Sequence, residues 1–415
     1  MNLYEYNTPT KVLFGRGSEQ EAGRMIRAFG GAKALVHYGG GSAVRSGLLE
    51  RVCASLSEAG VDYVTLGGVV PNPRLSKVRE GIALGRAEGV DFLLAVGGGS
   101  VLDSAKAIAY GLANEGDVWD FYSRKRVPSA CLPVGTVLTL AATGSEMSNS
   151  SVITNEEGWL KRGCNNDLCR CRFALLNPEL TATLPPYQTA CGCTDILMHT
   201  LERYFYRDGG MEITASMAEA LMRTVIVNAG ILMQEPGSYE ARAEVMWAGS
   251  LSHNGLTGFG TDGGDWACHQ LEHELSGMFD VTHGAGLAAV WGAWSRYVMD
   301  AAPERFARFA RAVMGVDTPG SDEETASRSS SGPLSTSSAP SACPPPWGSW
   351  ASRWTSRPSK SWPGCVPLRA GAPLAPLRCW AWRRSRISTG RPGKLFMKNA
   401  VAYRFRYATG FLLSG

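Results

Sequence analysis

The chain has no acidic residues in its last 91 positions. All 37 Asp and Glu lie before residue 325, whereas 14 of the 41 Lys and Arg lie between 325 and 415. This leaves 27 basic against 37 acidic residues in the first 324, a net charge of −10. The overall charge of +4 therefore hides an acidic body and a basic tail. An acidic body gives no support to nucleic-acid binding.

Long apolar runs and secretion signals are also missing. No run of 18 apolar residues occurs, and the opening MNLYEYNTPTKVLFGRG has neither a basic nor an apolar leader region. The 11 cysteines, an odd number, show no disulfide-framework spacing. We therefore expect no membrane span, and a cytoplasmic location where most thiols stay reduced.

The first 180 residues alternate between short apolar runs and helical patterns. KALVHY (33–38) and DFLLAV (91–96) read as buried strands, and each is soon followed by a glycine-rich GGGS turn. A buried strand, a glycine turn and a helix open a parallel βα unit. We expect residues 1–180 to form a doubly wound α/β domain with a parallel sheet. Further strands are predicted at VDYVTL (61–66), CLPVGTVL (131–138) and FALLNPEL (173–180).

From residue 181 the pattern becomes helical throughout. Residues 181–324 are therefore predicted to form a second, all-helical domain, with a cleft between the two domains. The predicted helices with a 3.6-residue period are 188–206, 211–233, 238–257, 264–276, 283–299 and 302–316.

Residues 325–415 follow neither pattern and form an aberrant basic tail. The stretch 326–394 is rich in Ser, Pro and Arg and holds six of the 12 tryptophans. Proline at this density excludes long helices, and a Ser/Pro linker does not explain the Trp and Cys. We expect poor order here and hypothesise a reading-frame shift near residue 326, with a genuine basic extension as the alternative. Translating the gene in its other two frames tests this, because a shifted frame would hide an acidic, helix-periodic segment.

The stretch DILMH (195–199) places an aspartate and a histidine four residues apart on a predicted helix. Positions i and i+4 share one helix face, so Asp195 and His199 point the same way within an apolar segment. A buried charge needs a partner. An ordinary hydrogen-bonded pair and a metal site both satisfy that need, and the pair alone does not decide between them.

More histidines follow in DWACHQLEHELSGMFDVTHG (265–284). His269 and His273 again lie four residues apart, and His283 precedes a glycine. Each of them alone could simply pack between helices. Together, one carboxylate and three imidazoles suit Fe²⁺ or Zn²⁺ and leave a position for a substrate oxygen. This metal set would be Asp195, His199, His269 and His283.

A competing cluster consists of cysteines. CNNDLCRCR (164–172) and CGC (191–193) together hold five of them. Their C-x-C spacings fit the usual C-x₂-C zinc pattern poorly, so we expect small buried or loop residues there.

Taken together, the chain resembles the iron-containing (group III) alcohol dehydrogenases, and within them the branch of butanol dehydrogenases and aldehyde reductases. The resemblance runs from residue 2 to about 320. It implies a Rossmann-like domain followed by an all-helical metal-binding domain, a dehydroquinate synthase-like fold, with metal and nicotinamide in the cleft. It rests on YGGGS (38–42), PNP (71–73), AVGGGSVLDSAK (95–106), GTVLTLAATGSEMS (135–148), ITNEE (153–157), LNPELTATLPP (176–186), DILMHTLERYF (195–205) and DWACHQLEHELSGMFDVTHGAG (265–286).

The resemblance also implies roles for single residues. The aspartate and three histidines named above match the metal ligands, and His273 matches the histidine beside the nicotinamide. Asp103 matches a position that shapes the nicotinamide pocket, so His273 and Asp103 are the catalytic candidates. The predicted cofactor contacts are the pyrophosphate loop of Gly97, Gly98, Gly99 and Ser100, with Thr136, Thr139 and Lys161 along the cofactor.

The ribose end of the cofactor site lacks an acid. NAD-preferring relatives place an aspartate after the first buried strand, where it binds the ribose 2′-hydroxyl. Small residues leave space and amides for a 2′-phosphate instead, so NADP(H) is favoured over NAD(H). Asn72 is expected near the same region. The residues after the strand here are Gly39, Gly40, Gly41 and Ser42.

The implied activity is hydride transfer between NADP(H) and short-chain primary alcohols or aldehydes such as butanol and butyraldehyde. The implied metal is Fe²⁺ or Zn²⁺, the partner is a small molecule, and relatives are homodimers or larger. A polyol oxidoreductase like glycerol dehydrogenase, or a lyase like dehydroquinate synthase, is an alternative on the same fold. The ligand set and the TGSE stretch (143–146) favour the alcohol dehydrogenase. A chain inactivated by its altered C-terminus is the remaining alternative.

Overall fold

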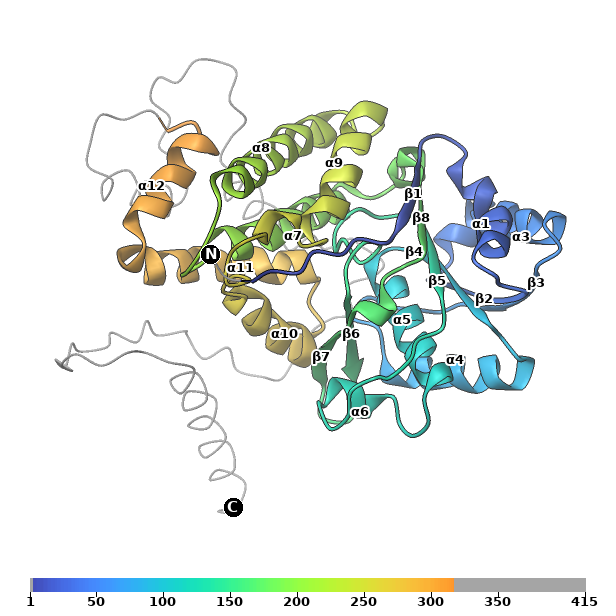
Figure 1. Ribbon diagram of the computed structural model, residues 1–415. Coiled ribbons are helices and arrows are strands. Elements are labelled where there is room, and N and C mark those ends of the chain that lie inside the picture. Colours follow the sequence, from blue (N-terminus) through green and yellow to red (C-terminus); the bar gives the residue numbers. More distant parts are fainter. Residues whose placement is uncertain (1–2, 317–415) are drawn as a thin grey trace, which may run out of the picture. The chain divides into compact units, whose positions relative to one another are not determined.

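The structure is a computed structural model that describes residues 3–316, all of which belong to one compact unit (Figure 1). The tail at 325–415, with its hypothesised frame shift and poor order, lies outside the described residues. The boundary between the domains at 180 and 181 remains a prediction. We refer below to the sheet part and the helical part of the described chain.

Six parallel strands form the central sheet, in the order β1-β8-β5-β4-β2-β3. Five of them confirm strands predicted from apolar runs. The short outer strand β1 was not predicted, because its four residues are only partly buried. The strands are β1 (Lys11–Phe14), β2 (Lys33–Tyr38), β3 (Asp62–Leu66), β4 (Phe92–Gly97), β5 (Val134–Leu138) and β8 (Phe173–Leu176).

Helices cover both faces of this sheet, as a doubly wound fold requires. Alternate residues of a strand point to opposite faces. Leu93 and Ala95 of β4 therefore join one core cluster, with residues of α4 (Leu75–Glu88) and α5 (Gly99–Ala113). Leu94 of the same strand joins the other cluster. That second cluster contains residues of α1 (Ala22–Ala28) and α3 (Leu48–Glu58).

An antiparallel hairpin was not predicted. Strands β6 (Ser150–Asn155) and β7 (Leu160–Asn165) pair along their whole length. Their sequences, SSVITN and LKRGCN, are too polar to read as buried strands. The hairpin contacts α5 of the sheet part and α10 (Ala267–Phe279) of the helical part, so it joins the two.

Every helix predicted for the helical part is present. Figure 1 shows them gathered beside one another, and their apolar faces form a third core cluster that includes Ile196, Met222 and Leu287. They are α7 (Pro186–Tyr204), α8 (Glu212–Gln234), α9 (Tyr239–Ser252), α10, α11 (His283–Val298) and α12 (Pro303–Ala312). Short helices α2 (Ser42–Arg45) and α6 (Trp119–Tyr122) lie in the sheet part.

One helix, α8, is long and apolar enough to cross a membrane, judged by length and composition alone. It packs against α7 and α9, and core helices of soluble proteins commonly pass the same test. Its sequence still contains charged residues such as Glu219 and Arg223, in keeping with the absence of an unbroken apolar run.

Candidate active site and metal centre

The two glycine turns lie at one edge of the sheet. Strands β2 and β4 are adjacent and parallel, so the turns that follow them, residues 39–42 and 97–100, leave the sheet at the same end. Open α/β sheets bind ligands at this end, where the strand order reverses. The reversal occurs here between β2 and β4.

The second turn, residues 97–100, lets a ligand come close to its backbone. Gly97 ends β4, Gly98 precedes α5, and no side chain caps the start of that helix. A Cβ on Gly99 would lie 2.3 Å from Thr143, and one on Gly97 would lie 2.5 Å from Val101. The turn therefore requires glycine, and the uncapped amides of the first helical turn fit a cofactor phosphate.

The remaining predicted cofactor residues are in different surroundings. Ser100 and Lys161 line a cavity of about 1200 Å³. Thr136 is fully buried within the sheet, where its hydroxyl donates to the carbonyl of Ala95 at 3.1 Å. The backbone amide of Thr139 donates to Gly97, next to the glycine turn.

Asn72 also lines this cavity, but its side chain is engaged at the helical part. Its amide donates to Asp280 at 2.9 Å and to the carbonyl of Val281 at 3.2 Å, between α10 and α11. The structure therefore shows the Asn72 side chain bound to that connection rather than to the turn at 39–42.

Asp103 and the unpredicted Lys106 hold the loop that follows β5. Asp103 accepts a hydrogen bond from the Ser145 hydroxyl at 2.7 Å, and burial raises the pKa of this carboxyl despite nearby Lys106. The fully buried Lys106 ammonium donates to the carbonyl oxygens of Ser145, Ser148 and Ser150. The TGSE stretch is thus fixed at the cavity by two charged side chains of α5.

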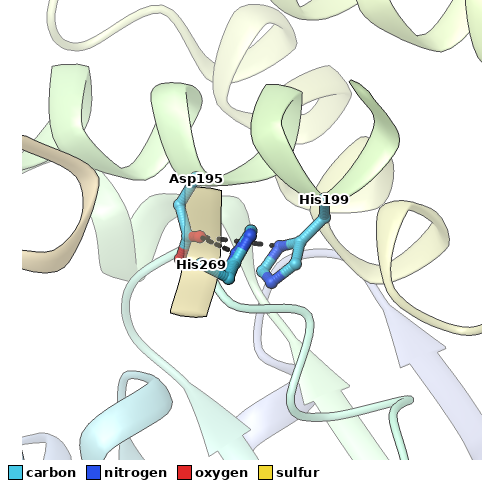
Figure 2. A group of neighbouring side chains, drawn as sticks. All are labelled: Asp195, His199 and His269. Carbon is cyan, nitrogen blue, oxygen red and sulfur yellow. Dashed lines mark ion pairs between the residues drawn. The ribbon is translucent and has the colours of Figure 1, made fainter. Parts of the chain in front are cut away.

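The predicted metal ligands meet around one carboxylate oxygen. Asp195 and His199 lie one turn apart on α7, and their Oδ1 and Nδ1 atoms are 3.6 Å apart. His269 of α10 brings its Nε2 to 3.7 Å from the same oxygen, as Figure 2 shows. His283, the first residue of α11, brings its Nε2 to 3.6 Å. Four side chains from three helices therefore converge as predicted.

Several of these atoms lack any hydrogen-bond partner. Among the described residues, eight buried side-chain N or O atoms are unpartnered, and five belong to this cluster or its immediate neighbours. Burying an unpaired polar atom costs free energy, and a bound cation would remove that cost. One carboxylate and three imidazoles form a donor set that fits a divalent iron or zinc ion. The five atoms are Asp195 Oδ1, His199 Nδ1, Glu202 Oε2, His253 Nδ1 and His269 Nε2.

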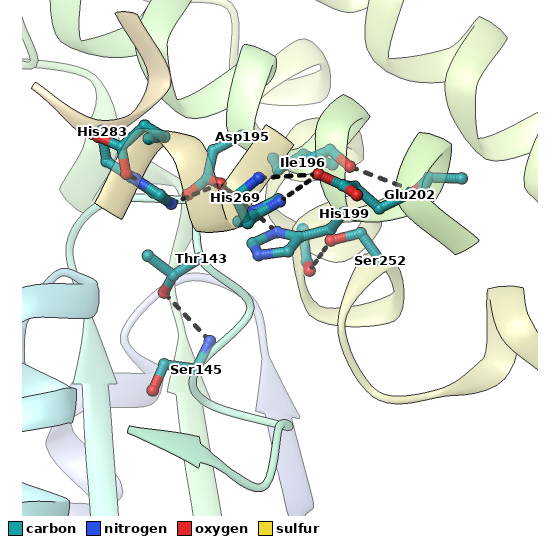
Figure 3. Close-up of polar contacts among 12 residues, drawn as sticks. Thr143, Ser145, Asp195, Ile196, His199, Glu202, Ser252, His269 and His283 are labelled. Atoms are coloured by element: carbon teal, nitrogen blue, oxygen red, sulfur yellow. Dashed lines mark hydrogen bonds and ion pairs between the residues drawn. The ribbon is translucent and has the colours of Figure 1, made fainter. Parts of the chain in front are cut away.

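A second carboxylate, missed in the sequence, holds His269. Glu202 lies on α7, and its Oε1 accepts from both the backbone N and the ring Nδ1 of His269, at 2.9 and 3.0 Å (Figure 3). Burial alone would lower the pKa of His269, but the carboxylates of Asp195 and Glu202 raise it to about 9. Glu202 follows His199 by three residues, and this helical spacing is the only signal that pointed to it.

Glu272, also missed, holds His283 from the opposite side. Its Oε2 accepts from His283 Nδ1 and lies 3.2 Å from the ammonium of Lys161, on the hairpin strand β7. Burial would raise the pKa of Glu272, but His283 and Lys161 lower it to about 2. The Lys161 pKa is lowered by burial, which Glu272 partly offsets.

His273 lines the same cavity, and its ring centre lies 5.7 Å from that of His283. Burial, with Lys161 and His283 nearby, lowers its pKa well below the usual value, so the imidazole is neutral near pH 7. The predicted catalytic histidine is therefore close to the ligand group, and no ion pair between it and Asp195 is found among the described residues.

The competing cysteine cluster does not form a metal site in the described part of the chain. All five thiols are free and buried, and the groups of side chains able to hold a metal there contain no cysteine. Burial is the largest influence on Cys171 and Cys193, and it raises the pKa of each thiol to about 12. This agrees with the expectation of small buried residues.

Comparison with known proteins identifies the family. The family description "Iron-containing alcohol dehydrogenase" matches residues 9–178, and "Fe-containing alcohol dehydrogenase family, C-terminal" matches residues 189–331. NADH-dependent butanol dehydrogenase A of Clostridium acetobutylicum is 42% identical over 318 residues, which is 76% of this chain and 81% of that protein. The NADPH-dependent aldehyde reductase YqhD of Escherichia coli is 38% identical over 328 residues, covering 78% of this chain and 83% of that protein.

Solved structures agree with the sequence matches. The crystal structure of NADH-dependent butanol dehydrogenase A from Thermotoga maritima superimposes with a TM-score of 0.78 at 37% identity, covering 85% of this chain and 84% of that one. These matches confirm the predicted fold class and family. The chain belongs to the iron-containing alcohol dehydrogenase family, whose members are oxidoreductases of alcohols and aldehydes.

Proposed function

We propose that this chain is a cytoplasmic, metal-dependent reductase of short-chain aldehydes that prefers NADPH and also oxidises the corresponding primary alcohols. The observation that carries the proposal is the convergence of three histidine side chains on Asp195 Oδ1, with unpartnered buried atoms, beside the cavity that Ser100 and Lys161 line. Metal ligands and dinucleotide contacts border one space, as hydride transfer to a polarised carbonyl requires.

The proposed ligands are Asp195, His199, His269 and His283. Bound there, Fe²⁺ or Zn²⁺ would polarise the carbonyl of an aldehyde while the nicotinamide supplies the hydride. The neutral His273 is the proposed proton relay, in which one ring nitrogen gives its proton toward the substrate oxygen while the other takes a proton from water, since the ring borders the cavity close to His283. Asp103 acts by holding the loop at Ser145 in place.

The NADPH preference rests on the turn after β2. Relatives named NADH-dependent butanol dehydrogenases are 39–42% identical to this chain and the NADPH-dependent YqhD is 38% identical, so the comparisons do not favour NADPH. Residues 39–42 contain no acid, and the exposed Arg45 lies against the turn, with Nη1 2.3 Å from where a Gly41 Cβ would be. In the described part of the chain no carboxylate pairs with Arg45, so its guanidinium is available to a 2′-phosphate.

The test is oxidation of NADPH, and separately of NADH, with butyraldehyde by the full chain after loading with Fe²⁺ or Zn²⁺. We expect chelator-sensitive turnover and a higher kcat/KM with NADPH. In Arg45→Ala, kcat/KM for NADPH should fall about 10- to 100-fold, the value of one charge-assisted hydrogen bond, and NADH turnover should not change. Arg24→Ala, an exposed arginine on α1, is the matched control.

Each outcome bears on a separate part of the proposal. A preference for NADH in the wild type contradicts the cofactor assignment alone. Reduction of NAD(P)+ by glycerol, without NAD(P)H oxidation by butyraldehyde, contradicts the substrate class. A monodisperse protein that binds NADPH but shows no turnover with either metal contradicts the enzymatic proposal.

A further inference from the structure

A row of three contacting polar side chains, two of them buried and charged, connects the ligand cluster to the sheet part. It consists of Lys161 on β7, Glu272 on α10 and His283 at the start of α11. Glu272 is fully buried, and its Oε2 contacts His283 Nδ1 and lies 3.2 Å from Lys161 Nζ. Its Oε1 accepts from the hydroxyl of Ser276. Both oxygens of this carboxylate are therefore engaged.

The two nitrogens of His283 face in different directions. Nε2 faces Asp195 Oδ1 at 3.6 Å, whereas Nδ1 faces Glu272 and Lys161. A neutral imidazole that binds a metal through one nitrogen carries its hydrogen on the other. Lysine only donates, so Glu272 is the acceptor for that hydrogen. This contact leaves the lone pair of Nε2 directed toward Asp195.

Lys161 supplies the positive counter-charge that the buried carboxylate of Glu272 needs. Ligand atoms of Glu272, His273 and His283 lie within 4.8 Å of one another, close enough to hold a cation. The Lys161 ammonium is already there, 3.2 Å from Glu272 and 3.3 Å from His283 Nδ1. A buried carboxylate is costly without a counter-charge, and this ammonium balances it. The position is thus filled by the protein's own cation.

We propose that Glu272 is a positioning residue that orients His283 as a metal ligand and, through Lys161, joins the metal centre to the β6–β7 hairpin. The inference rests on the proposed metal site. Glu202 gives His269 the same kind of support from α7, but it has no contact with the sheet part among the interactions described. Glu272 is therefore the carboxylate through which both parts of the fold meet the metal centre.

The test measures metal binding in the full chain without cofactor or substrate. The affinity for Zn²⁺ is determined by competition with a chromophoric chelator, and the absorption spectrum of bound Co²⁺ reports the ligand geometry. In Glu272→Gln the side chain keeps its shape but loses its negative charge and one of its two acceptor oxygens. It therefore no longer balances the charge of Lys161, and its single oxygen cannot serve both His283 and Ser276. We expect Zn²⁺ affinity to fall about 10- to 100-fold, with an altered Co²⁺ spectrum.

The matched control is Glu274→Gln, two residues further along α10. Glu274 is exposed and pairs with Arg162, so its variant should bind Zn²⁺ like the wild type.

Unchanged Zn²⁺ affinity and Co²⁺ spectrum in Glu272→Gln would overturn the inference. Should that variant not fold, Ser276→Ala decides, because it removes the hydroxyl that holds Oε1 and leaves the carboxylate in place; the same hydroxyl also lies 3.1 Å from the carbonyl of Val281. Weaker Zn²⁺ binding in Ser276→Ala supports the role, and unchanged binding overturns it. A wild type that binds no Zn²⁺ contradicts the proposed metal site itself.

Discussion

The sheet part and the helical part both bury histidines, but they complete the hydrogen bonds of those histidines differently. In the sheet part, His37 of β2 is fully buried, its Nδ1 donates to the carbonyl of Leu66, and its Nε2 accepts from the hydroxyl of Ser104, both at 2.9 Å. In the helical part, His199 Nδ1 and His269 Nε2 have no hydrogen-bond partner. Both of these atoms instead face one carboxylate oxygen at 3.6–3.7 Å.

The difference separates a structural histidine from the proposed metal ligands. A buried imidazole with both nitrogens bonded gains nothing from a metal, whereas one with a free nitrogen beside a carboxylate remains unsatisfied without a cation. The sheet part contributes to the site mainly through backbone amides at glycine turns, and the helical part through side chains. The first arrangement suits a phosphate and the second a metal.

The largest effect should come from Asp195→Asn, which removes the charge that three imidazoles face. We expect Zn²⁺ affinity to fall at least about 100-fold and aldehyde reduction to fall by roughly 10³-fold or more, because a Lewis acid contributes several kcal/mol to such a step. Chelator competition and NADPH oxidation measure the two effects. NADPH binding, which we assign to the sheet part, should persist.

Asp300→Asn, an exposed aspartate that follows α11, is the control and should change neither quantity. Full Zn²⁺ binding by Asp195→Asn would mean that the unpartnered atoms do not mark a metal site. The contrast with His37 would then lose its meaning.

A smaller effect on the stability of the protein should follow a fall in pH, through His37 of the sheet part. Burial lowers the pKa of His37 from 6.5 to about 4, so the unfolded chain binds its proton first as the pH falls. The stability from neutral His37 is fully present above pH 6.5 and is lost between about pH 6.5 and 4, up to about 3 kcal/mol. Urea unfolding across this range measures the loss.

The non-titrating variant His37→Gln tests the assignment. It should be less stable at pH 7 but should show a shallower loss of stability between pH 6.5 and 4. Direct titration of labelled histidine by NMR should find His37 neutral down to about pH 4. An ordinary pKa near 6.5 would show that burial does not keep this imidazole neutral.

Much of the fold could be predicted from apolar periodicity. The strand predicted at 33–38 matches β2 residue for residue, and the helix predicted at 211–233 matches α8 to within one residue at each end. The hairpin β6–β7 could not be predicted, because its alternating polar residues are stabilised by contacts with α5 and α10 that lie far away in the sequence. Tertiary packing, not local propensity, forms these strands.

The site could be predicted in part. The i,i+4 spacing of Asp195 and His199 marks one helix face, and the histidine cluster at 265–284 completed the proposed ligand set, which the family resemblance then supported. Beyond the three-residue spacing of Glu202 from His199, the sequence does not distinguish Glu202 or Glu272 from exposed glutamates, because burial and the partner's position decide their roles. His37 and His253 likewise read alike in the sequence, although one is fully bonded and the other has an unpartnered Nδ1 beside His199.

The smallest expected effect comes from Ser104→Ala, which makes His37 resemble the ligand histidines. The variant removes the donor to Nε2 and leaves one buried acceptor unpaired, at a cost of about 1–2 kcal/mol. The urea midpoint should fall accordingly, and Ser57→Ala, an exposed serine on α3, should leave it unchanged. Zn²⁺ should not restore the loss, because neither of the two groups of described side chains that could hold a metal includes His37. Unchanged stability would mean that an unpartnered buried nitrogen costs little in this protein. The free nitrogens around Asp195 would then no longer argue for a metal, and the ligand assignment would depend on Zn²⁺ binding alone.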